Sequence, residues 1–196
     1  MITTAPDLRV LHAVRTLGYA DIDRIAERAH LMPAEAQEYL LDAQAFGQVS
    51  WSEFGGDGGW SLTESGKAHG ETLLAAELDA AGARELLEQV HQDFLPLNRI
   101  VAAACSGRQL TELGLGEQTL SSTLAQLAGP ADALRHLEAR LTTVLRRFCG
   151  YHARFAGALE QAAQSPEWIT ATDRDSCHRV WFELHEDLIA TLGLTR

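Results

Sequence analysis

A glycine-rich segment between two short apolar runs constrains the fold of this chain more than any other feature. Four glycines fall within residues 55–59. Val49 and Trp51 alternate with polar residues before this segment, and Trp60 and Leu62 do so after it. Glycine readily adopts the positive φ angles of tight turns, so two alternating runs around a Gly/Asp loop predict a β-hairpin.

Helical patterns surround this hairpin. Asp21 is a good N-cap, Pro33 suits the first position of a helix, and Gly47 is a typical helix stop. Together with apolar residues spaced three and four apart, these signals predict three helices before the hairpin and one after it. The expected ranges are 7–17, 22–29, 33–46 and 63–80.

Residues 81–196 are expected to form a second, helical domain after a first domain over residues 1–80. Apolar spacing predicts helices over about 83–104, 117–128, 130–162 and 173–192. Pro96 predicts a kink or break in the first of these. Asp173 or Asp175 is expected to cap the last, and Glu183 with Asp187 to form a solvated acidic edge.

Residues from about 8 to 78, a little over a third of the chain, resemble the winged helix-turn-helix of bacterial regulators of the MarR and PadR kind. The resemblance is carried by IDRIAERAHLMPAEAQEYLLDAQAFGQV (22–49) and by the stretch WSLTESGK (60–67). The second stretch is similar to the family's aromatic-x-Leu-Thr-x-x-Gly-basic passage from the wing into the next helix. The resemblance implies a mainly α fold: an N-terminal winged helix-turn-helix with a two-stranded wing, followed by a C-terminal helical domain.

The resemblance also implies a function. In such regulators the third helix enters the major groove of double-stranded DNA, the wing touches phosphate or the minor groove, and a small-molecule effector often binds between the domains. We therefore expect a ligand-responsive, DNA-binding transcription regulator. The residues expected to contact DNA are Arg24, Arg28, Gln37, Gln44, Trp51 and Ser52. An alternative for Arg24 and Arg28 is intrahelical pairing with Asp21, and with Asp23 or Glu27, respectively.

The charge of the same region favours a different partner. Residues 1–80 hold five basic and thirteen acidic side chains, a net charge of −8 within a total of −11. A helical wheel with Ala36 and Leu40 inward turns three carboxylates outward and no cation. The outward residues are Ala34, Glu35, Glu38, Leu41, Asp42 and Ala45. Because cations supply most non-specific DNA affinity, the second hypothesis is an adaptor whose acidic third helix docks a basic protein.

Polar and aromatic residues recur along the C-terminal helices and could line a pocket for an anionic or aromatic ligand. The candidates are His91, Asn98, Arg146, Tyr151, His178, Trp181 and His185. The alternative is that the histidines only pack between helices. His178 and His185 lie seven residues apart, rather than the three or four typical of metal ligands on one helix, so no metal or cofactor is expected. The apolar excess of the last two helices predicts a homodimer built through them.

Other functional classes find no support in the sequence. It has no nucleophile elbow, zinc-protease, P-loop or dinucleotide-binding motif in its proper context, so an enzyme is not expected. No apolar run is long enough for a membrane span, and the N-terminus lacks the pattern of a secretory signal. Three widely spaced cysteines fit a reducing, cytoplasmic setting.

Overall fold

The computed structural model describes residues 2–194, most of which lie in helices. They form two compact units, here called the hairpin unit (residues 2–84 with 186–194) and the helical unit (residues 85–185). The expected mainly helical fold class, with one two-stranded sheet after three helices, is confirmed. Residues 81–196 were expected to form the second domain, whereas residues 186–194 belong to the hairpin unit in the structure.

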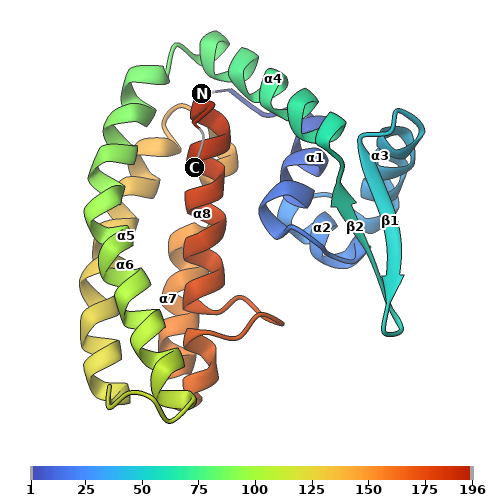
Figure 1. Ribbon diagram of the computed structural model, residues 1–196. Helices are drawn as coiled ribbons and strands as arrows, with labels where there is room; N and C mark the ends of the chain where they lie inside the picture. The colour runs from blue at the N-terminus through green and yellow to red at the C-terminus, as the bar shows by residue number, and fades with distance from the viewer. Residues whose placement is uncertain (1, 195–196) are drawn as a thin grey trace. The chain divides into compact units, whose positions relative to one another are not determined.

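The hairpin unit follows the expected order of elements and has a layout consistent with a winged helix (Figure 1). It contains α1 (Pro6–Leu17), α2 (Ile22–Ala29), α3 (Pro33–Ala45), β1 (Val49–Phe54), β2 (Asp57–Leu62) and α4 (Glu64–Ala81). As expected, the Asp21 side chain caps α2 by accepting a hydrogen bond from the backbone N–H of Arg24 at 2.9 Å. Pro33 begins α3, where its missing N–H costs no helical bond.

The two strands pair antiparallel around a two-residue turn. Gly55 and Gly56 have φ angles of 65° and 97°, the left-handed values that a tight hairpin turn needs at both positions. β2 also pairs on its other side with Ala20, which exchanges two backbone hydrogen bonds with Trp60. The connection between α1 and α2 therefore holds the hairpin against the helices.

One apolar core joins the three helices to the hairpin. Its buried residues come from α1, α2, α3 and both strands, and they include Val10, Val14, Ile25, Leu40, Val49 and Trp60. Burying a large apolar side chain contributes about 1.5–3 kcal/mol, so this cluster fixes which face of α3 points inward.

The Leu-Thr-x-x-Gly stretch fastens α4 to the start of the hairpin. The Thr63 hydroxyl accepts from the N–H of Gly66 at 3.0 Å and donates to the carbonyl of Gly47 at 2.6 Å. A β-carbon at position 66 would lie 1.8 Å from the carbonyl oxygen of Gln48, so only glycine allows this approach. In this chain, the Leu-Thr-x-x-Gly stretch therefore stabilises the contact between α4 and the start of the hairpin.

The C-terminal end of α8 (Cys177–Leu192) completes the hairpin unit. His12 Nε2 lies 2.9 Å from Asp187 Oδ1, and Arg15 pairs with Glu186 at 2.9 Å and with Glu71 at 2.8 Å. Ala190 packs in a small buried cluster with Leu8 and Leu74.

The expectation that Glu183 and Asp187 form a solvated acidic edge on this last helix is wrong. Glu183 is fully buried and Asp187 is 1% exposed. Each carboxylate has a basic partner from another helix: Arg154 for Glu183 and His12 for Asp187.

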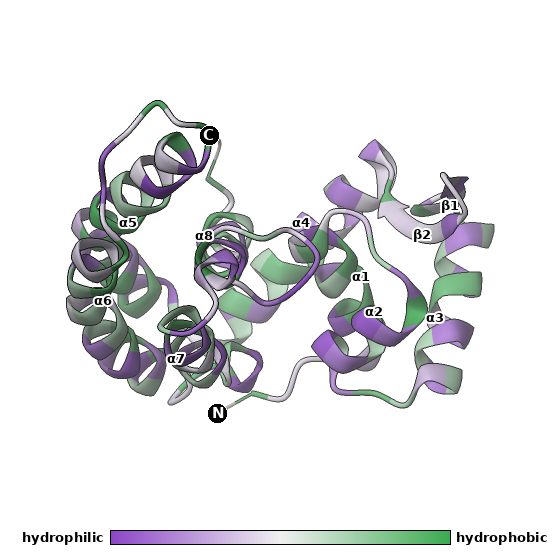
Figure 2. Cartoon of the chain, turned by 90° about the horizontal axis from the view of Figure 1, so that it is seen from below, coloured by the Kyte–Doolittle hydropathy of each residue, from purple (hydrophilic) through white to green (hydrophobic). Residues whose placement is uncertain are grey.

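In the helical unit, four helices run side by side (Figures 1 and 2), and the residues buried between them are mainly apolar. They are α5 (Arg84–Glu112), α6 (Leu120–Leu141), α7 (Tyr151–Ala162) and the first part of α8. Two short 3₁₀ helices, η1 (Arg146–Phe148) and η2 (Pro166–Ile169), lie in the connections.

The expected long helix over 130–162 is wrong, since the structure divides this stretch between α6 and α7. Gly150 has a φ angle of 101°, which an α-helix cannot contain. The Glu138 carboxylate of α6 accepts hydrogen bonds from the N–H groups of Gly150 at 3.0 Å and His152 at 2.6 Å. A carboxylate from the preceding helix therefore caps the first turn of α7.

Two prolines lie inside helices rather than at their ends. A kink or a break was expected at Pro96, and the structure excludes the break because α5 continues through this residue. α6 continues through Pro130 and includes residues assigned to a separate short helix over 117–128. The cap expected from Asp173 or Asp175 is also wrong, because the Ser176 hydroxyl accepts from the N–H of Arg179 at the start of α8.

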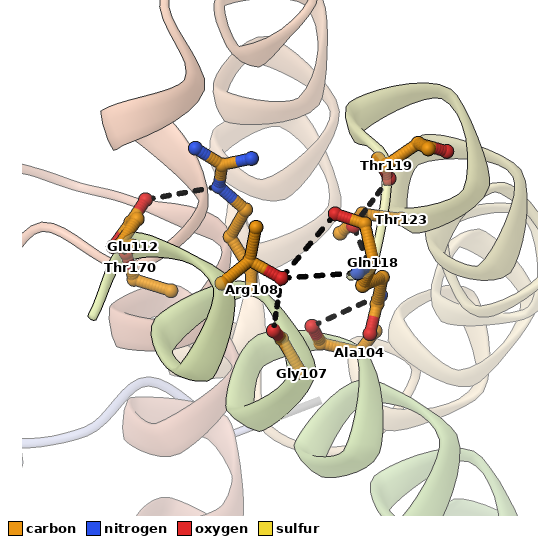
Figure 3. A network of polar contacts seen from close by, with 9 residues as sticks. Ala104, Gly107, Arg108, Glu112, Gln118, Thr119, Thr123 and Thr170 are labelled. Atoms are coloured by element: carbon orange, nitrogen blue, oxygen red, sulfur yellow. Dashed lines mark hydrogen bonds and ion pairs between the residues drawn. The ribbon is translucent and has the colours of Figure 1, made fainter. Parts of the chain in front are cut away.

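A polar network holds the connection between α5 and α6 (Figure 3). The Gln118 amide donates to the Thr123 hydroxyl at 2.9 Å and its backbone N–H donates to the Thr111 hydroxyl at 3.0 Å. Gly107 allows this, because a β-carbon there would lie 1.7 Å from Gln118 Oε1.

Candidate macromolecule-binding surface

α3 presents one fully exposed acidic face. Glu35, Glu38 and Asp42 are all exposed, whereas Ala36 and Leu40 on the opposite side are completely buried. All six residues that the helical wheel turned outward are exposed in the structure, and Gln44 is exposed with them. Figure 2 shows the resulting alternation of hydrophilic and hydrophobic residues along α3.

Large apolar side chains lie exposed beside these carboxylates. Met32 precedes α3 and is 71% exposed, Leu41 within it is 51% exposed, and Phe46 at its end is 75% exposed. Aromatic residues and methionine are enriched in the buried centres of protein interfaces, whereas a DNA backbone offers them little. In this respect α3 resembles a protein-binding helix.

Two arginines of the hairpin unit are engaged in contacts within the fold. The Arg9 guanidinium donates to the carbonyls of Ala29 and His30 at the end of α2. Arg15 is engaged by two glutamates, with its side chain 9% exposed. Two of the five basic residues in the first eighty thus serve the fold rather than a partner.

The residues expected to contact DNA do not share one surface environment. Arg24 and Arg28 are half-buried, and both already interact with other groups of the chain. Gln37 is half-buried and Gln44 is exposed on α3, while Ser52 is exposed on β1.

The hairpin carries two aromatic rings on its glycines. A β-carbon at Gly58 would lie 2.5 Å from the Trp51 ring, and one at Gly59 would lie 2.5 Å from the Tyr19 ring. The Tyr19 hydroxyl is 2.9 Å from the carbonyl oxygens of both Ser52 and Asp57. Trp51 is left 48% exposed, a further apolar contact point on the hairpin unit.

A cleft of about 630 Å³ opens between α1, α3 and α4. Buried Leu11 and Ala43 belong to its lining, with Tyr39 half-buried and Phe46 exposed. Its polar lining consists of Asp7, Asp42, Gln48 and His69. The volume is in the range of pockets that hold small ligands or anchor side chains. Sequence reasoning missed this cleft, because its residues come from three helices.

In the helical unit, the structure brings together four of the seven ligand candidates. His91 on α5 stacks on His185 at 6.3 Å between ring centroids, and the Trp181 indole N–H donates to Asn98 Oδ1 at 3.0 Å. Phe94 fills the space between them, with its ring 4.9 Å from Trp181 and 5.2 Å from His185. In this arrangement the rings of His91, Phe94, Trp181 and His185 pack against one another.

The remaining ligand candidates lie in different surroundings. Tyr151 is buried, with the Arg154 guanidinium 5.5 Å from its ring centroid, and Arg146 is exposed on η1. His178 is half-buried, and burial lowers its pKa, as it does that of His91.

A partly buried ion network around Glu183 joins α7 to α8 and to the segment before it. Arg154 of α7 donates to Asp175 at 2.6 Å and to Glu183 at 2.5 Å, and Arg179 lies 3.6 Å from Glu183. Burial acts to lower the pKa of Arg154, but the charges of Glu183 and Asp175 outweigh it and the pKa is raised. The opposite charges of these arginines and carboxylates offset one another, so the network has a structural role.

Among residues 2–194, no group of three or more histidine, cysteine or acidic side chains is placed to hold a metal ion. No helix in the same range has the length and apolar character needed to cross a membrane.

Comparisons with known proteins add no family to this description. No protein-family model, curated protein or solved structure matches the chain.

Proposed function

We propose that the hairpin unit is a winged helix that recognises a protein rather than DNA, through the exposed face of α3. The observation that carries this proposal is the composition of that face: Glu35, Glu38 and Asp42 beside exposed Leu41 and Phe46. Carboxylates next to large apolar side chains suit a partner segment with basic and apolar residues. In this reading the protein acts as an adaptor for a basic partner.

Electrostatics argue in the same direction. A duplex presents a dense row of phosphates, and three carboxylates entering its groove would be repelled without cations to offset them. The same carboxylates would speed association with a basic protein by steering it before contact.

A DNA-binding regulator is the second candidate. The three-helix and hairpin layout favours it, since that layout commonly places the third helix in the major groove. In that case the protein would act as a homodimer gated by a small effector. The apolar residues of α7 and α8 that suggested such a dimer are buried within the chain, for example Phe155, Trp181 and Leu188.

One experiment separates the two candidates. The immobilised full chain is exposed to a library of random peptides displayed on phage, and in parallel its binding to random-sequence duplex DNA is titrated with salt by fluorescence anisotropy. We expect enriched peptides that carry net positive charge and apolar residues, and no duplex binding even at about 50 mM salt.

Charge reversal provides the internal control. Glu35→Lys with Glu38→Lys should abolish binding of the enriched peptides. Glu88→Lys with Glu160→Lys makes the same charge change at exposed sites of the helical unit and should leave binding unchanged. Salt-sensitive binding of the wild-type chain to duplex DNA, without enrichment of basic peptides, would overturn the adaptor proposal in favour of the regulator.

A further inference from the structure

The cleft between α1, α3 and α4 adjoins the acidic face of α3 and shares residues with it. Asp42 and Phe46 line the cleft, and both are exposed at the surface of the unit. A partner lying along the acidic face would therefore meet the opening of the cleft.

The lining of the cleft combines three kinds of group. Leu11 and Ala43 provide buried apolar contact, Tyr39 and Phe46 provide aromatic rings, and Asp7 and Asp42 provide negative charge. A long side chain with an apolar stem and a planar cation matches all three. The stem can lie along apolar surface, and the cation can pair with a carboxylate and stack on a ring.

We propose that this cleft is an anchor site for an arginine side chain of the partner protein, together with an apolar neighbour of that arginine. Lysine has a compact, strongly hydrated charge, and it neither forms a bidentate pair with a carboxylate nor stacks as a plane on an aromatic ring. The volume of about 630 Å³ leaves room for the second, apolar side chain. Arginine and aromatic side chains are also the commonest anchors at the centres of protein interfaces.

This inference rests on the proposed protein-binding function and adds to it the chemistry of the anchor. Peptides selected by the full chain are expected to contain an arginine next to an aromatic or aliphatic residue. Replacing that arginine by citrulline, which keeps the shape and loses the charge, should weaken binding about tenfold or more. Replacing it by lysine, which keeps only the charge, should also weaken binding measurably.

Variants of the cleft test the same contact from the other side. Asp7→Asn with Asp42→Asn should weaken peptide binding about tenfold or more, and Phe46→Ala should weaken it independently. All three side chains are exposed, and circular dichroism verifies that each variant remains folded. The matched control is Asp23→Asn with Asp57→Asn, which removes the same charge from exposed positions of the same unit and should leave affinity unchanged.

The possible failures are distinguishable. If Glu35→Lys with Glu38→Lys abolishes binding while the Asp7 and Asp42 variants and Phe46→Ala bind normally, the anchor site is overturned and the adaptor function stands. If selected peptides show no preference for basic residues, both proposals are overturned.

Discussion

Gly66 approaches the backbone of Gln48 so closely that a β-carbon at position 66 would lie 1.8 Å from the Gln48 carbonyl oxygen. The same oxygen accepts a hydrogen bond from the N–H of Thr63 at 3.0 Å. The first turn of α4 is therefore fixed directly against the segment that leads from α3 into β1. Since α3 carries the proposed binding face, this contact holds that face in its orientation to the hairpin.

Gly66→Ala should accordingly destabilise the protein by about 2 kcal/mol or more, because the added methyl group has no space beside a backbone carbonyl. Gly70 is the matched control: it is buried in the same helix, but a β-carbon there meets nothing within 4 Å. Gly70→Ala should stabilise by up to about 1 kcal/mol through the better helix propensity of alanine. Urea unfolding followed by circular dichroism measures both, and a shift in the same direction for the two variants would contradict this account.

The three cysteines should differ sharply in reactivity. Burial raises the pKa of the Cys105 and Cys177 thiols to about 12, whereas Cys149 is exposed. The thiolate is the reactive form, so one thiol should react rapidly with a disulfide reagent in the native protein at about pH 8. All three should react in denaturant. Rapid native reaction of Cys149→Ser would show that the buried thiols are accessible.

Removing the Arg154 guanidinium from the ion network around Glu183 should lower the stability of the protein strongly. Arg154→Met removes the 2.5 Å ion pair of Glu183, whose side chain is 1% exposed, while Arg179 lies farther from it, at 3.6 Å. Breaking a buried pair in this way costs about 3–5 kcal/mol. Arg135→Met removes the exposed pair with Asp132 and should change stability by less than about 1 kcal/mol. Comparable midpoints of thermal unfolding for the two variants would show that Glu183 does not depend on Arg154.

Stability should fall as the solution becomes acidic through the range in which unfolded histidines titrate. Burial lowers the pKa of His91 and His178 below the ordinary value of 6.5, so the unfolded chain takes up these protons first. The destabilisation by these two histidines is absent well above pH 6.5 and grows as the pH falls below that value. In urea unfolding between about pH 8 and pH 5, His91→Gln with His178→Gln should flatten the profile. His136→Gln, at an exposed position of α6, should not.

Local signals in the sequence predicted the hairpin unit well because each acts on its immediate neighbours. Asp21 caps the helix that directly follows it, Pro33 begins the helix in which it lies, and the glycines at 55 and 56 form their own turn. The acidic face of α3 follows from helical periodicity alone. These features need no knowledge of the remaining chain.

Features that depend on distant parts of the chain were not predictable in this way. Apolar residues continue at helical spacing from α6 into α7 because both helices pack on one core, so periodicity could not reveal the break. The carboxylate that caps α7 is supplied by Glu138, twelve residues before Gly150. Glu183 and Asp187 resemble surface residues until their partners, Arg154 and His12, are known.

The cleft beside α3 also depends on distant parts of the chain. Asp7, Tyr39 and His69 lie on three different helices, and only the packing of those helices makes them neighbours. The exposure of Phe46 is equally invisible in sequence, where a phenylalanine at a helix end reads as a core residue.

The pairing of His12 with Asp187 has a consequence for how the protein is made. During synthesis, the ribosome produces the first eighty-four residues before Glu186 and Asp187. Until then, His12 cannot pair with Asp187 and Arg15 cannot pair with Glu186. A fragment that ends at residue 84 would therefore lack both of these ion pairs.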